Sequence, residues 1–120
     1  LNMAKSVAAC QQPEGYWTRS MLDAAHAPGP ETSGTAFFTY GLLWGLNNGL
    51  LDKETYHPVV EKAWKYLTTV ALQPDGRVGY VQPIGEKAIP GQVVDANSTS
   101  NFGVGAFLLA ACEMVRYLNK

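Results

Sequence analysis

The sequence has few charges, no excess of either sign and no long hydrophobic run. Nine Lys and Arg stand against ten Asp and Glu among 120 residues, for a net charge of −1. Binding to a polyphosphate backbone needs a basic field, so we expect no nucleic acid partner. The longest apolar run, around residues 106–112, falls short of the roughly 20 residues of a membrane-spanning helix. We therefore expect no membrane contact.

Cysteine and the common catalytic motifs are also scarce. Cys10 and Cys112 each lie in an apolar helical pattern, which favours buried reduced thiols over a disulfide. The sequence contains no CxxC, no G-x-S-x-G and no G-x-x-x-x-G-K, and neither His26 nor His57 has a second histidine at i, i+4 for a metal. No charged segment leads into an apolar one at the N-terminus, so no signal peptide is expected. These observations predict no metal site.

The sequence does contain helical periodicity. Apolar residues recur at helical spacing over residues 1–12 and from Pro58 to residue 71, and the second of these segments has a charged opposite face. Residues 34–50 and 99–118 are apolar on nearly every face, which is typical of a helix surrounded by protein. No segment alternates like a strand. We predict an all-α chain in which amphipathic and buried helices alternate.

An internal repeat relates the two halves of the chain. Residues 12–15 (QPEG) recur 61 positions later as residues 73–76 (QPDG). Four residues recur 64 positions later, namely Glu31, Thr35, Phe38 and Gly41 as Asp95, Thr99, Phe102 and Gly105. Each unit is then a helical hairpin, with repeat 1 at about 1–52 and repeat 2 at about 53–120 of one segment. A hairpin cannot bury its inner face alone. We predict two hairpins of an (α/α)6-toroid, a partial barrel.

Two long loops, residues 13–33 and 74–98, join the outer to the inner helices and must lie at the same end of the barrel. Loops of this length tend to be functional. They combine aromatic, acidic and basic side chains, which suits sugar binding because a ring covers the apolar face of a pyranose while charged groups bind hydroxyls or a carboxylate. The candidate substrate-binding residues are Trp17, Arg19, Glu31, Tyr80, Asp95 and Ser98.

Structural roles are open alternatives for the same residues. Trp17 and Tyr80 are equally suited to anchoring their loops on the helix ends. Glu31 and Asp95 stand just before the inner helices at equivalent repeat positions, where a carboxylate caps the helix N-terminus, and Ser98 is also a cap candidate. If the barrel mouth is a site, the two carboxylates could instead act as general acid and base.

Several segments resemble a known family. These are residues 17–23 (WTRSMLD), 30–41 (PETSGTAFFTYG), 45–52 (GLNNGLLD) and 73–85 (QPDGRVGYVQPIG). They look like the C-terminal part of unsaturated rhamnogalacturonyl and glucuronyl hydrolases, glycoside hydrolase families 105 and 88. These are six-hairpin glycosidases of pectin and glycosaminoglycan breakdown. The similarity covers nearly the whole chain.

The resemblance implies an enzyme that removes a terminal 4,5-unsaturated uronic acid from oligosaccharides. In that family an Asp protonates the C4=C5 double bond, which is hydrated without a metal or organic cofactor. A family chain is about three times this length, and its catalytic Asp pair lies in the first half. The catalytic residues are therefore expected outside this segment. The resemblance also suggests a bacterial enzyme of the periplasm or cytoplasm.

One other function is kept as an alternative, and a second is set aside. The chain could be a non-catalytic hairpin module that binds carbohydrate or a protein partner through its lateral faces. Residues 12–17 also resemble the Gln-Trp repeats of terpene-cyclase toroids, but the acid-rich protonation motif of that family is absent and Val78 replaces Trp in the second copy. In the favoured interpretation, the lateral faces bind the missing N-terminal hairpins or a second copy of the chain.

Overall fold

The computed structural model describes residues 2–82 and 92–119. The last three residues of the expected family segment 73–85 therefore lie outside the described residues. The elements are α1 (Asn2–Ala9), α2 (Thr32–Asn47), α3 (Lys53–Tyr66), the π-helical turn η1 (Leu67–Ala71) and α4 (Asn101–Leu118). Over these ranges the only extended pairing is a single bridge between Leu72 and Val78. The all-α prediction is confirmed.

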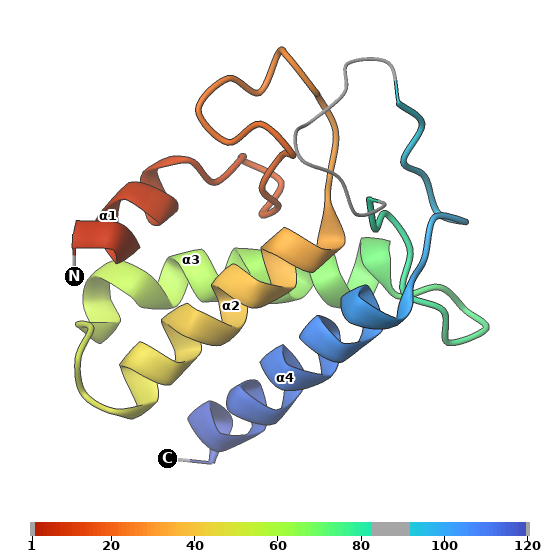
Figure 1. The fold of residues 1–120 in the computed structure, drawn as a ribbon. Helices are drawn as coiled ribbons and strands as arrows, with labels where there is room; N and C mark the ends of the chain where they lie inside the picture. Colours follow the sequence, from red (N-terminus) through yellow and green to blue (C-terminus); the bar gives the residue numbers. More distant parts are fainter. Residues whose placement is uncertain (1, 83–91, 120) are drawn as a thin grey trace.

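The helices form two layers. The inner helices α2 and α4 lie side by side and run in the same direction, while α3 runs back across them (Figure 1). Small buried residues let α2 and α4 approach closely: Ala36 on one helix, and Ala106 and Ala110 on the other. Val60 and Ala63 of α3 are fully buried against this pair. This is the predicted order of an outer amphipathic helix over inner apolar ones.

The repeated QPEG and QPDG segments form the same turn. In the first copy, the Gly15 N–H donates to the Gln12 carbonyl and the Gln12 N–H donates to the Tyr16 carbonyl, both at 2.9 Å. Residues 73–77 repeat both bonds, at 2.9 and 2.7 Å. Gly15 and Gly76 both have a left-handed φ, of 102° and 90°. The internal repeat is therefore present in the backbone at these turns.

The expected start of α3 at Pro58 is wrong, because the helix begins five residues earlier. Asp52 is its N-cap, and a carboxylate oxygen accepts the Thr55 N–H at 2.8 Å. Pro58 lies in the second turn, where its missing N–H leaves one carbonyl near the exposed helix start without an intrahelical bond. The first turn is polar, so apolar spacing did not reveal it.

The inner helices are not buried all round within this chain. Trp44 of α2 is 45% exposed and Leu108 of α4 is 57% exposed. Cys112 is also exposed, against the expectation of burial, although both cysteines are free thiols as predicted. By length and composition α4 is apolar enough to cross a membrane, although no run of consecutive apolar residues in the sequence is that long. The core helices of soluble proteins can have the same length and composition, so this is weak evidence for a membrane span. Each inner helix keeps one apolar side open.

Candidate functional site

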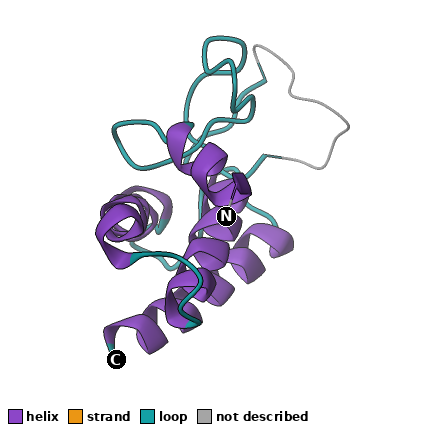
Figure 2. Cartoon of the chain, turned by 90° about the vertical axis from the view of Figure 1, so that its left-hand side faces the viewer, coloured by secondary structure: helices purple, strands orange, loops and turns teal. Residues whose placement is uncertain are grey.

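Both long loops are tied to the N-terminal end of α2. In the views of Figures 1 and 2 the first loop and the described parts of the second gather at one end of the helical layers. The Trp17 N–H donates to Thr35 Oγ1 at 3.0 Å, and the Trp17 carbonyl accepts the Glu31 N–H at 3.2 Å. From the second loop, the Tyr80 carbonyl accepts the Thr32 N–H at 2.7 Å. The predicted convergence of the loops is therefore found.

Glu31 is the N-cap of α2 and is only 2% exposed. Its carboxylate accepts the N–H groups of Ser33 at 3.1 Å and Gly34 at 2.7 Å, and the Ser33 hydroxyl lies 2.7 and 2.9 Å from its two oxygens. A fourth donor, the Gln82 N–H at 3.0 Å, comes from the second loop. The capping alternative for Glu31 is confirmed.

A small pocket of about 160 Å³ opens beside this cap. Both loops and the first turns of α2 line it, and its charged side chains are Arg19 and Glu31. The Arg19 guanidinium donates to the Gln92 side-chain oxygen at 2.8 Å and to the Gln92 carbonyl at 3.3 Å. The lining residues are Trp17, Thr18, Arg19, Met21, Glu31, Gly34, Phe38 and Gln82. The pocket thus combines the cation of Arg19, an apolar wall and one polar residue of the second loop, Gln82.

Trp17 anchors the first loop. Its indole is 1% exposed, its Nε1–H donates to the Val7 carbonyl at 2.7 Å, and its ring meets Phe38 edge-on with centroids 5.3 Å apart. The residue belongs to the pocket wall, but this exposure is too small for a sugar ring to stack on the indole. The structure therefore corrects the expectation of sugar stacking and supports the anchoring alternative.

Tyr80, Asp95 and Ser98 form a second group, held together by backbone bonds. The Tyr80 N–H donates to the Asp95 carbonyl at 2.8 Å, and the Val81 N–H donates to the Ser98 carbonyl at 2.9 Å. Tyr80 has a φ of 62°, a left-handed conformation that is uncommon for a bulky residue and concentrates at functional sites. None of these three residues lines the pocket beside Glu31.

Asp95 is not the counterpart of Glu31. The N-cap position of α4 is Ser100, five residues further on, and the side chain of Ser100 makes no capping bond. The exposed Asp95 carboxylate instead accepts the Asn97 N–H at 3.0 Å and the Ser98 hydroxyl at 3.3 Å, closing a local turn. The predicted equivalence of the two carboxylates and the cap role of Ser98 are therefore wrong, since the second loop is longer before its helix begins.

A buried hydroxyl pair lies directly behind the α2 cap. Tyr66 Oη and Thr32 Oγ1 are 2.7 Å apart, and Thr32 Oγ1 donates to the Gly79 carbonyl at 2.6 Å. Burial raises the pKa of Tyr66 well above its usual range; the nearby Glu31 carboxylate adds to that rise, while the bond to Thr32 opposes it. Tyr66 therefore stays protonated and serves as a neutral link between α3, α2 and the second loop.

Sequence reasoning missed two partners at this site. Gln92 holds Arg19 across 73 residues, and no local pattern connects the two. Gln82 binds Glu31 through its backbone N–H, a group that every residue other than proline carries. As for metals, the described parts of the chain contain no group of three or more His, Cys, Asp or Glu side chains that could hold one.

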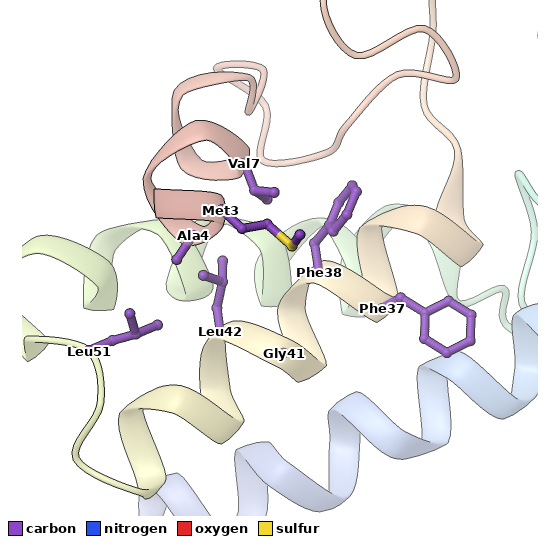
Figure 3. Close-up of a pocket in the computed structure, with 8 residues that line it drawn as sticks. All are labelled: Met3, Ala4, Val7, Phe37, Phe38, Gly41, Leu42 and Leu51. Atoms are coloured by element: carbon purple, nitrogen blue, oxygen red, sulfur yellow. The ribbon is translucent and has the colours of Figure 1, made fainter. Parts of the chain in front are cut away.

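A second, apolar pocket of about 300 Å³ lies between α1 and α2. Figure 3 shows Met3 and Val7 of α1 on one side, with Phe38 and Leu42 of α2 on the other. None of the described residues that line it is charged, in contrast with the pocket beside Glu31. Its character is that of a packing surface.

Comparison with known proteins decides the family. The model of glycosyl hydrolase family 88 matches residues 1–118. The chain belongs to this family. An unsaturated 3S-rhamnoglycuronyl hydrolase of Formosa agariphila is 44% identical over 115 residues, which are 96% of this chain and 29% of that protein. The chain thus spans less than a third of this curated relative.

Two solved structures share the fold of this chain at high sequence identity. A glycosyl hydrolase family 88 protein from Bacteroides vulgatus is 76% identical with a TM-score of 0.91, over 96% of this chain and 33% of that one. A structure described as a polysaccharide lyase is 87% identical with a TM-score of 0.92, over 98% and 33%.

The toroid fold is also supported by a more distant relative. A possible family 105 member from Salmonella enterica is 21% identical with a TM-score of 0.81, over 96% of this chain and 30% of that one. These relatives are six-hairpin toroids, and two of six hairpins make up a third of such a chain. The prediction of a partial (α/α)6 barrel is confirmed.

Proposed function

We propose that the whole protein is a hydrolase that removes a 4,5-unsaturated uronic acid from the end of an oligosaccharide. Acid-catalysed addition of water across the C4=C5 bond gives a hemiketal, which opens and releases the sugar. We place the catalytic acid outside this chain. The proposal rests on the pocket beside Glu31, which the guanidinium of Arg19 lines in a chain that belongs to family 88.

In this proposal Arg19 binds the anionic part of the substrate. A uronate carboxylate takes two parallel N–H bonds from a guanidinium, and a charged acceptor is stronger than the amide oxygen of Gln92 that Arg19 now contacts. On binding, the substrate carboxylate then replaces Gln92 as the acceptor of these Arg19 hydrogen bonds. The Formosa agariphila relative is named as an unsaturated 3S-rhamnoglycuronyl hydrolase, so its substrate carries an unsaturated uronyl group.

The activity is tested with an unsaturated disaccharide and the full-length protein. A hydrolase of this class consumes the C4=C5 double bond, so its ultraviolet absorbance falls. The 87% identical structure is described as a polysaccharide lyase, and a lyase would instead create this absorbance from an intact uronic acid polymer. A rise with polymer and no change with the disaccharide would contradict the proposal.

The role of Arg19 is tested by Arg19→Met in the same assay. Loss of hydrogen bonds to a charged group predicts a KM about tenfold higher or more. Arg77→Met is the matched control, because Arg77 also lies in a long loop but bonds Asp75 and Asn97. An unchanged KM in Arg19→Met would exclude the assigned role.

The partners follow from the same proposal. We infer that neighbouring hairpins of the toroid cover the apolar pocket between α1 and α2 and the open sides of the inner helices. A segment of the protein taken alone would offer these surfaces to a second copy of itself.

A further inference from the structure

We propose that Glu31 is a positioning residue, which holds the first and the second long loop around the pocket beside it without touching the substrate. This inference rests on the proposed function, because it assigns the pocket to substrate. It revises the expectation that Glu31 binds sugar. The reason is that the carboxylate is buried and already has four protein donors, which leaves little acceptor capacity for a hydroxyl.

Glu31 joins three segments that all line the pocket. Its backbone N–H binds the Trp17 carbonyl of the first loop, and its carboxylate binds the Gln82 N–H of the second. The same carboxylate caps α2 through Ser33 and Gly34. Arg19 follows Trp17 by two residues, so the anchored backbone sets where the guanidinium enters the pocket. Moving the carboxylate would release the wall formed by the second loop and the cap of α2, while the backbone bond to Trp17 would stay.

The length of the side chain matters as well as its charge. All four partners are donors, and a carboxylate is the side-chain group that only accepts. Asp is a preferred N-cap residue, so Glu31→Asp keeps an acceptor for the first turn of α2. It is one methylene shorter and cannot also keep its bond to Gln82. Glu31→Asp therefore separates capping from positioning.

The experiment compares Glu31→Asp with Asp52→Ala in the full-length protein. Asp52 caps α3 with one bond to Thr55 and lies outside the pocket. We expect Glu31→Asp to raise KM for an unsaturated disaccharide fivefold or more, with kcat within twofold. Asp52→Ala should lower the melting temperature and leave KM unchanged.

Amide hydrogen exchange gives a readout that does not depend on turnover. Glu31→Asp should speed exchange at residues 79–82, while Asp52→Ala should not. Unchanged exchange there, or a normal KM in an active Glu31→Asp enzyme, would overturn the inference. A wild-type protein without turnover would instead overturn the proposed function, and exchange would still decide whether Glu31 holds the second loop.

Discussion

At the scale of single residues, two glycines at matching repeat positions have different neighbours. Gly15 and Gly76 occupy the same turn with similar positive φ, which L side chains rarely adopt. A Cβ on Gly15 would collide with the backbone carbonyl of Lys62 in α3, whereas a Cβ on Gly76 would meet nothing within 4 Å. The first turn is packed against the outer helix and the second is open.

This difference predicts unequal costs for the same substitution. Gly76→Ala should destabilise the protein by about 1 kcal/mol, the usual cost of a left-handed alanine. Gly15→Ala adds a collision with backbone that cannot rotate away, so we expect about 3 kcal/mol or more. Thermal melting of the two variants checks this. Equal shifts would show that the first turn is not packed against α3.

At the scale of elements, each inner helix has a covered and an open side. Phe107 of α4 is buried against Trp64, with ring centroids 6.0 Å apart, while Trp44 of α2 is nearly half exposed in this chain. In a closed toroid the neighbouring hairpins cover such open sides. The two aromatic residues should then be equally important in the whole protein.

We therefore expect Trp44→Ala and Phe107→Ala each to cost about 3–5 kcal/mol in the full-length protein. Denaturant unfolding measures both. A loss below about 1 kcal/mol for Trp44→Ala, beside a large loss for Phe107→Ala, would show that the open side of α2 faces solvent rather than a neighbouring hairpin.

Local chemistry made part of this arrangement predictable from sequence. The Pro-acid-Gly turns and the apolar helices were found because glycine conformation and helical periodicity are encoded locally. The start of α3 was missed because its first turn is polar, and Asp95 was misplaced because the spacing of the repeat changes before α4. The pairing of Arg19 with Gln92 joins distant segments, so it depends on the tertiary fold.

At the scale of the whole molecule, the chain is about a third of a ring. It supplies two hairpins, one end of which carries the pocket beside Glu31, while its lateral surfaces carry exposed apolar residues. Soluble monomers rarely leave contiguous apolar patches larger than a few hundred Å² uncovered. A head-to-tail ring of three chains would restore six hairpins, and a twofold dimer would cover one surface.

The most direct test of this dependence on neighbouring hairpins is static light scattering on the isolated 120-residue chain at micromolar concentration. We predict a mass of at least two chains, with a ring of three or a twofold dimer as the closed forms. A compact monomer of 13.0 kDa that melts cooperatively would contradict the account and favour a self-contained helical module.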